Sequence, residues 1–185
     1  MTDDFQKIEE QLTVLLAQRG DQDAFRRLLD LYDARLLYFV RRILGEADGA
    51  LDILQAVWLT VHRKLPTLRS ADAFRVWIYR IAHDHAVAEL RRKSRRPVLF
   101  EDAPDGAPPD PAASDDAPFE DAELVHAALL RLSPDHRRVL TLRFLEDMPV
   151  EAIAEVVGCG VGTVKSRLHY AKAALRRQIE EYRRG

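Results

Sequence analysis

The segment 148–175 constrains the fold of this chain more than any other, because its apolar residues follow two short helical repeats. A helix returns to the same face after three or four residues, so apolar residues at that spacing mark a buried stripe. The two stripes consist of Ile153, Ala154 and Val157, then Val164, Leu168, Ala171 and Leu175. Between them Gly158 suits the left-handed residue that ends a helix, because glycine has no Cβ to clash. This pattern predicts a helix-turn-helix, with the small Ala154 at the helix crossing.

Off the apolar stripe, the second of these helices carries cationic and hydrogen-bonding side chains. Such side chains on a projecting helix are what readout of the DNA major groove requires. The predicted DNA contacts are Thr163, Lys165, Ser166, Arg167, His169, Tyr170 and Lys172. An ordinary helical hairpin with a solvated basic face is the alternative. The short turn and the small crossing residue favour DNA binding.

The net charge of -2 conceals an uneven distribution of charge along the chain. Residues 1–96 carry 17 Lys and Arg against 14 Asp and Glu, and residues 124–185 carry 11 against 7. Residues 97–123 carry 9 acidic residues and no Lys or Arg, and they are rich in Pro, Ala and Asp. Such a segment cannot bury enough apolar surface to offset its ordering entropy. We expect a flexible linker that serves either as a spacer or as an anionic occupant of a basic channel on a partner.

Helical periodicity on both sides of this segment, without an alternating strand pattern, predicts an all-α chain. We expect two small helical domains, 1–96 and 123–185, joined by a flexible acidic linker at 97–122. A proline cannot continue a helix, and Ser and Asp are good caps, so these residues suggest the helix ends. In the second domain, Ser133-Pro134 should begin a helix that carries Val139, Leu140, Leu142 and Phe144.

Four helices are expected in the first domain. The first is amphipathic, with Phe5, Ile8, Leu12, Leu15 and Leu16 on its apolar face. The second begins at a cap formed by Asp21 or Asp23 and stops at Gly45. The third runs from about Ala47 to Leu65, is closed by Pro66, and turns inward Leu51, Leu54, Val57, Trp58 and Val61. The fourth starts after Ser70, a good cap, and ends in a basic run at 91–96.

The basic run 91–96 places five cations in six positions, which repel one another unless a polyanion is near. A solvated tail is the alternative interpretation. The preceding helix also offers Arg75, Arg80, His83 and His85, which favours contact with phosphates.

Other features narrow the class of protein. The single Cys159 cannot form an internal disulfide framework, which fits a reducing cytoplasm. No apolar run approaches the ~18 residues of a membrane span, and the N-terminus is too acidic for a signal peptide, so we expect a cytoplasmic protein without membrane insertion. The chain has no Walker A loop, no dinucleotide-binding glycine pattern and no G-x-S-x-G elbow, so we expect neither an enzyme nor a cofactor. His83 and His85 lack the Cys or carboxylate companions of a zinc site, so no metal is expected.

At this point the sequence resembles a known family over nearly its whole length: the extracytoplasmic-function (ECF) class of bacterial RNA polymerase sigma factors. The resemblance rests on DAFRRLLDLYDARLLYFVRRIL, LDILQAVWLTVHRKL and AFRVWIYRIAHDHAVAELRRKSRR in the first domain, and on GTVKSR in the second. GTVKSR alone would also fit response-regulator output domains. Its pairing with the upstream WIYRIA segment makes the match specific.

The resemblance implies an ECF-type sigma factor that binds core RNA polymerase and directs transcription initiation from -35 and -10 promoter elements. It implies polymerase contacts from Asp52, Gln55 and Trp58, and an anti-sigma factor or other regulator as a further partner. The residues implied at the -10 element are Arg75, Arg80, His83, Asp84, Arg91, Arg92, Arg95 and Arg96. The alternative is a stand-alone helix-turn-helix regulator that acts without polymerase.

The chain also departs from the family pattern. An acidic cluster is usual before the docking helix, whereas residues 49–52 hold one carboxylate, and Ala56 stands where Glu is usual. We therefore expect weaker docking on a basic surface, unless phosphorylation of the nearby Thr60 restores charge. Asp84 replaces a frequent Asn, and a carboxylate accepts hydrogen bonds without donating any, so we expect an altered -10 preference.

Overall fold

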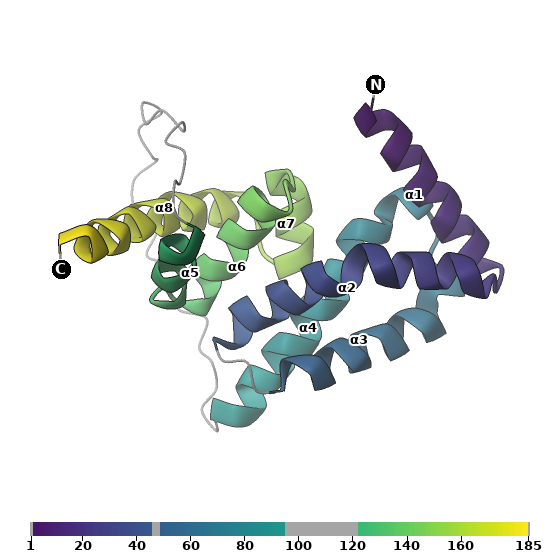
Figure 1. Ribbon diagram of the computed structural model, residues 1–185, viewed down its shortest axis with the longest axis horizontal. Coiled ribbons are helices and arrows are strands. Elements are labelled where there is room, and N and C mark those ends of the chain that lie inside the picture. The colour runs from purple at the N-terminus through teal and green to yellow at the C-terminus, as the bar shows by residue number, and fades with distance from the viewer. Residues whose placement is uncertain (1, 46–48, 95–121, 185) are drawn as a thin grey trace. The chain divides into compact units, whose positions relative to one another are not determined.

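The computed structural model describes residues 2–45, 49–94 and 122–184, and within these ranges every regular element is a helix (Figure 1). The prediction of an all-α fold is therefore confirmed. The chain divides into two compact units, Met1–Lys93 and Ser94–Gly185, named unit 1 and unit 2 below. Nearly all of the predicted acidic linker, with Arg95 and Arg96 of the basic run, lies outside the described residues.

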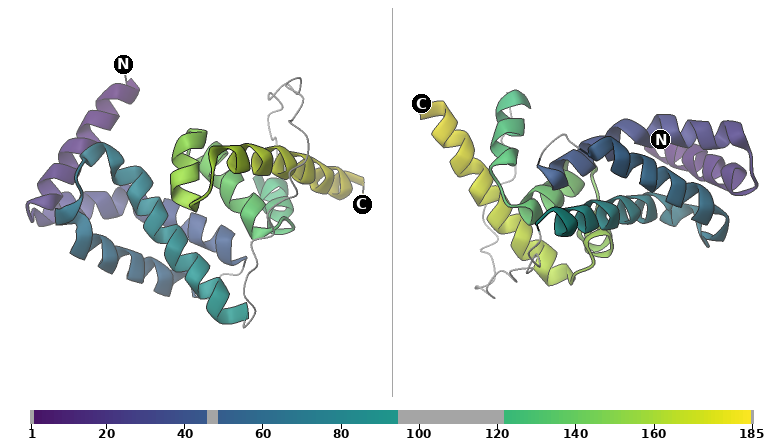
Figure 2. Two further views of the ribbon diagram at one scale, coloured as in Figure 1. Left: turned by 180° about the vertical axis from the view of Figure 1, so that it is seen from behind. Right: turned by 90° about the horizontal axis from the view of Figure 1, so that it is seen from below.

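Unit 1 is built from four α-helices: α1 (Thr2–Gln18), α2 (Gln22–Leu44), α3 (Ala50–Lys64) and α4 (Phe74–Ser94). Two short 3-10 turns, η1 (Leu65–Thr67) and η2 (Ala71–Ala73), connect α3 to α4. The central α2 packs against both α1 and α3, and the views from two further directions show the same arrangement (Figure 2).

Both ends of α2 follow capping chemistry. Asp21 caps α2, because its Oδ1 accepts a hydrogen bond from the Ala24 amide at 2.9 Å, whereas Asp23 pairs with Arg26. Gly45 ends α2 in the left-handed conformation at φ 76°, as the sequence predicted. Helical structure begins directly after Ser70, as predicted, with the turn η2 leading into α4, but the predicted cap is wrong because the Ser70 side chain makes no capping bond.

Buried aromatic rings join α2 to α4 and form part of the core of unit 1. Tyr32 packs edge-on against Phe74 at 5.5 Å between ring centroids, and Phe39 against Tyr79 at 5.3 Å. The Tyr32 hydroxyl donates a hydrogen bond to Glu10 at 2.5 Å, which ties α1 to α2. Burial, and then the contact with Glu10, raises the pKa of Tyr32 far above its ordinary value, so the phenol remains a donor.

Unit 2 contains α5 (Ala122–Leu130), α6 (Pro134–Leu140), α7 (Val150–Val157) and the long α8 (Val161–Arg184), which packs against the other three. Ser133 caps α6 by accepting a hydrogen bond from the His136 amide, with Pro134 in the first turn as predicted. A single π turn, η3 (Thr141–Leu145), follows α6. Because a π turn is wider than an α turn, it changes which side chains face inward. Leu142 is buried, but Phe144 is exposed, contrary to its predicted place among the apolar residues of this helix.

Within the described part of the chain, we find no helix with the length and hydropathy that a membrane span requires.

Candidate nucleic-acid interface

The helix-turn-helix of unit 2 has the geometry that the sequence predicts. Gly158 ends α7 at φ 69°, and its amide donates to the Ala154 carbonyl at 2.9 Å. The Cys159 amide donates to the same carbonyl at 3.2 Å, which closes the turn before α8 begins at Val161. The apolar stripes of α7 and α8 are buried, so the opposite face of α8 is held outward on a rigid support.

The outward face of α8 carries a row of polar and aromatic side chains. Lys165, His169 and Tyr170 are exposed, and the His169 and Tyr170 rings pack edge-on at 5.4 Å. Thr163, Ser166 and Lys172 are half-buried, and the Lys172 ammonium lies 5.7 Å from the centre of the Phe144 ring. These residues could offer donors, an acceptor and a cation to base edges and phosphates.

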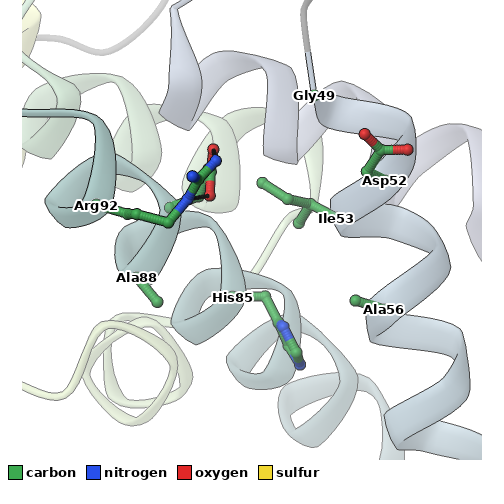
Figure 3. A pocket seen from close by; sticks show the side chains of 8 residues that line it. Gly49, Asp52, Ile53, Ala56, His85, Ala88 and Arg92 are labelled. Carbon is green, nitrogen blue, oxygen red and sulfur yellow. Dashed lines mark hydrogen bonds and ion pairs between the residues drawn. The ribbon is translucent and has the colours of Figure 1, made fainter.

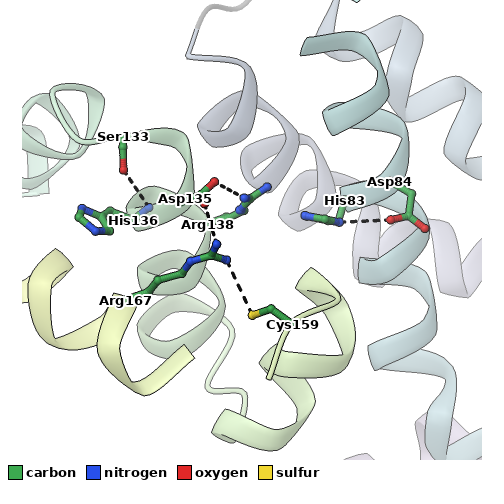
Figure 4. A network of polar contacts seen from close by, with 8 residues as sticks. All are labelled: His83, Asp84, Ser133, Asp135, His136, Arg138, Cys159 and Arg167. Atoms are coloured by element: carbon green, nitrogen blue, oxygen red, sulfur yellow. Dashed lines mark hydrogen bonds and ion pairs between the residues drawn. The ribbon is translucent and has the colours of Figure 1, made fainter. Parts of the chain in front are cut away.

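Arg167 does not lie on this outward face. The residue is only 4% exposed, and its guanidinium pairs with Asp135 on α6 at 3.0 Å and contacts the Cys159 sulfur at 3.7 Å (Figure 4). Asp135 also pairs with Arg138, three residues further along α6. The expectation that Arg167 faces outward was therefore wrong. Arg167 follows Val164 by three residues and precedes Ala171 by four, so it lies within the buried stripe. This helical spacing is the sequence signal that could have predicted its burial.

The cations around Asp135 affect the titration of their neighbours. Burial raises the pKa of the Cys159 thiol, and Arg167 and Arg138 offset this only in part, so the thiol is protonated at neutral pH. Burial also lowers the pKa of His136, the cation of Arg167 lowers it further, and Asp135 acts in the opposite direction. The network is thus a structural ion-pair cluster that joins α6, the turn and α8.

In unit 1, α4 presents most of its predicted contacts to solvent. Arg80, Asp84, Arg91 and Arg92 are exposed, and Arg75 is half-buried. Arg92 forms a two-bond pair with Glu89 at 2.7 Å. His83, in contrast, is buried, which corrects the expectation of a surface or DNA-facing histidine. Its Nδ1 lies 3.2 Å from Asp84 Oδ1, so His83 can orient the exposed carboxylate (Figure 4).

The outward face of α3 differs from the predicted one. Asp52 and Gln55 are exposed as expected. Trp58 is buried, as its apolar spacing predicted, so its ring is not on the face where the family resemblance implied a polymerase contact. The Trp58 indole donates to Asp33 at 2.9 Å and packs against Phe25. Leu51, predicted to point inward, is 62% exposed, and Leu59 is 60% exposed on the same side of the helix. The candidate docking face is therefore more apolar than the sequence reasoning indicated.

A groove lies between α3 and α4, where two alanines leave room between the helices. It is lined in part by Ala56, His85 and Ala88 (Figure 3). Thr60 is buried close by, and its hydroxyl donates to the Ala56 carbonyl at 2.9 Å and lies 3.1 Å from His85 Nε2. A kinase could not reach this hydroxyl in the folded unit, which argues against the phosphorylation hypothesis.

No group of three or more His, Cys, Asp or Glu side chains in the described ranges is arranged to hold a metal ion.

The fold and the outward face of α8 define a helix-turn-helix protein with a second helical unit. Comparison with known families gives a match to sigma-70 region 2 at residues 28–96 and to sigma-70 region 4 at residues 122–175. The RNA polymerase sigma-H factor of Pseudomonas aeruginosa is 35% identical over 182 residues, covering 93% of this chain and 94% of the relative. The ECF RNA polymerase sigma factor SigW of Bacillus subtilis is 27% identical, covering 89% of this chain and 93% of the relative. This chain therefore belongs to the sigma-70 family of RNA polymerase sigma factors, in its extracytoplasmic-function class.

Two solved structures have the same fold. CnrH, in complex with the cytosolic domain of CnrY, matches with a TM-score of 0.66 at 21% identity, covering 93% of this chain and 97% of that one. The sigma factor RpoE of Bartonella quintana, in complex with the anti-sigma factor NepR, matches with a TM-score of 0.66 at 24% identity, covering 84% of this chain and 96% of that one.

Proposed function

We propose that this chain binds core RNA polymerase and directs it to promoters by contacting the -35 element with α8 and the -10 element with α4. The observation that carries the proposal is the row formed by Lys165, His169 and Tyr170, exposed on a helix whose other face is packed into unit 2. A helix supported in this way can enter the major groove without rearrangement. Membership of the sigma family supplies the context of transcription initiation.

In this proposal Arg167 is a positioning residue rather than a DNA contact. Its pair with Asp135 fixes the rotation of α8 relative to α6, and its contact with Cys159 fixes the turn. The side chains left for the -35 element are Thr163, Lys165, Ser166, His169, Tyr170 and Lys172.

The -10 element would be bound by the exposed side of α4 with the basic run that follows it. Arg80, Asp84 and Arg91 are exposed, and Arg75 and Arg92 extend this charged surface. Cations on one helix supply phosphate contacts, and binding of extruded bases supplies the free energy for melting. The chain itself catalyses nothing in this mechanism.

Polymerase would dock on α3 through Asp52 and Gln55 together with Leu51 and Leu59. Burial of two large leucines compensates for the missing carboxylates before this helix, because apolar burial contributes more than an exposed ion pair. In this proposal, residues 1–96 bind polymerase and the -10 element, and residues 123–185 bind the -35 element. Residues 97–122 form the linker between them.

We also infer that an anti-sigma factor regulates the chain, and that it acts in the cytoplasm, where the polymerase is. The RpoE of Bartonella quintana, which has the same fold, was solved with an anti-sigma factor. Such a partner would act by preventing the two units from reaching their promoter elements together.

Run-off transcription with purified core enzyme on a library of genomic fragments tests the proposal. We expect discrete start sites that require both core enzyme and this chain, and weak, strongly salt-dependent gel shifts without core enzyme. A Lys165→Ala variant should lose activity at promoters with a -35 element while still binding core enzyme. A stand-alone regulator would instead give a tight, sequence-specific shift without polymerase, and that result would overturn the proposal.

A further inference from the structure

Helix α1 has two apolar faces, and the larger one points away from unit 1. The inner face is narrow and consists mainly of Val14 and Ala17, both buried against the rest of the unit. The outer face consists of four large apolar side chains that are 46–71% exposed: Phe5, Ile8, Leu12 and Leu15. We name these four residues the α1 stripe. In Figure 1 the N-terminal part of α1 extends beyond the other helices of unit 1.

Polar contacts fix α1 in this orientation, so the helix cannot roll over to bury the stripe. The Glu10 carboxylate accepts from the buried Tyr32 hydroxyl, and the Gln18 amide donates to the carbonyls of Leu65 and Leu68 at 3.1 and 2.7 Å. Gln11 donates to Asp72 on η2. A contiguous apolar face of this size on a rigid helix indicates a surface that another element covers.

The spacing of the stripe fits a second copy of itself. Its residues alternate three and four apart, which is the a and d pattern of a coiled coil. One antiparallel alignment pairs all four residues. In it, Phe5 of each copy lies opposite Leu15 of the other, and Ile8 lies opposite Leu12. Every large side chain therefore faces a large side chain across a two-fold axis, as an isologous interface requires.

The charges on α1 select the antiparallel direction. In the sequence of the helix, the acidic residues Asp3, Asp4, Glu9 and Glu10 all fall in the first half, where Lys7 offsets only one of them, and Arg19 follows the last turn. A parallel pair would bring the two acidic halves together, whereas an antiparallel pair brings Arg19 of each copy towards the acidic end of the other.

We propose that two copies of this chain associate through antiparallel packing of their α1 stripes. Four large apolar side chains from each helix supply roughly 1,000 Å² of buried surface, which is the lower limit for a specific interface. Interfaces of this size are typical of weak, reversible association, and we expect a dissociation constant on the order of 10–100 μM. The proposal is independent of the DNA and polymerase contacts described above.

Sedimentation equilibrium of the full chain tests this proposal directly. The mass should rise with concentration from 21.1 kDa towards twice that value. Leu12→Glu, at the centre of the stripe, should remain at the monomer mass. Leu59→Glu, an equally exposed leucine on α3, is the matched control and should associate like the wild type. A wild-type chain that remains a monomer at about 300 μM, well above the expected dissociation constant, would overturn the proposal.

A second pair of measurements tests the register. The antiparallel alignment brings Glu9 of the two copies together near the axis, so Glu9→Gln should tighten association by about two- to fivefold. In a Cys159→Ser background, an Ile8→Cys chain mixed with a Leu12→Cys chain should form a disulfide-linked dimer faster than either chain alone. If Ile8→Cys alone or Leu12→Cys alone formed the disulfide-linked dimer as fast as the mixture or faster, the antiparallel register would be wrong. If the wild type is monomeric and Leu12→Glu weakens binding of core polymerase, the stripe belongs to the polymerase interface and the proposal is wrong.

Discussion

Arg167 illustrates how a charged residue within a recognition helix can serve the fold instead of the DNA. Its guanidinium is buried between Asp135 and the Cys159 sulfur, while its neighbours Ser166 and Lys165 are progressively more exposed. A buried cation that loses its partner is costly, because the desolvation is no longer offset. The pair therefore specifies one packing of α8 on α6.

Arg167→Met should destabilise unit 2 and leave the electrostatics of DNA binding unchanged. We expect a loss of about 1–3 kcal/mol in the free energy of unfolding, measured by urea denaturation. The slope of log affinity against log salt should stay at the wild-type value, whereas Lys165→Ala should reduce it by ~0.9 if this ammonium contacts a phosphate. A reduced slope in Arg167→Met with unchanged stability would assign Arg167 to the DNA interface after all.

His136 should make the stability of unit 2 depend on pH. Its pKa is lowered from 6.5 in the folded chain, chiefly by burial, so the unfolded chain binds a proton more readily. The stabilising contribution is fully present above pH about 6.5 and is lost as the pH falls below that value. The urea midpoint should decrease between pH 7 and 5, and His136→Asn should decrease less. If the wild type and His136→Asn lost stability equally as the pH falls, the pH dependence would not come from His136.

Asp84 should influence which base is preferred in the -10 element. Its exposed carboxylate is oriented by His83 and can only accept hydrogen bonds, which favours an exposed amino group such as that of cytosine. Asp84→Asn adds a donor and should broaden or shift the preference. The test is the rate of open-complex formation on promoters that differ at single -10 positions, and an unchanged order of preference would count against the assignment.

At the scale of whole helices, amphipathicity indicates that a helix packs but leaves open which partner it packs against. α3 buries Ile53, Val57 and Val61 within unit 1 and leaves Leu51 and Leu59 outside. α1 follows the same principle more strongly, since its larger apolar face is the outer one. Outer leucines on otherwise well-packed helices are candidates for interfaces with other chains.

Leu59→Glu should weaken binding of core polymerase. Loss of one leucine from an apolar contact, with a charge introduced, costs about 1.4–3 kcal/mol, or roughly a 10- to 150-fold loss of affinity. Fluorescence titration of labelled chain with core enzyme measures this change. Leu12→Glu is the control with equal charge and should retain wild-type affinity. Equal effects from both variants would mean that the polymerase interface is not confined to α3.

At the scale of the whole molecule, the chain divides its two proposed promoter contacts between units that are separate in sequence and fold. Two weak contacts on one tether strengthen each other, because the second binds at a high effective concentration. The intervening residues 97–122 carry acidic side chains and no Lys or Arg, so we expect them to link the two units rather than to bind phosphates.

Cutting the tether should therefore abolish most promoter activity without unfolding either unit. A protease site inserted between residues 105 and 115 allows the purified chain to be cleaved before core enzyme is added. We expect transcription from a two-element promoter to fall by about 10²-fold or more at low protein concentration, and to recover partly at high concentration. The same insertion left uncleaved is the control. Full activity after cleavage would show that covalent linkage is unnecessary.

The sequence by itself determined the local structure and the family of this protein. Asp21, Gly45, Ser133-Pro134 and Gly158 predicted four of the helix ends, because caps and left-handed residues depend on chemistry within a few positions. The WIYRIA and GTVKSR segments identified the family for the same reason: they are contiguous.

Only the tertiary structure decided which side chains are available for binding. Helical spacing places Arg167 and Trp58 on the inner sides of their helices, but only the fold supplies the partners that satisfy their polar groups. Asp135, distant in sequence, pairs with Arg167, and Asp33 on α2 accepts from the Trp58 indole beside Phe25. Leu51 and the α1 stripe are exposed because neighbouring helices cover the other side of each helix. Periodicity defines the faces of a helix, but the direction in which each face points depends on contacts between residues far apart in the chain.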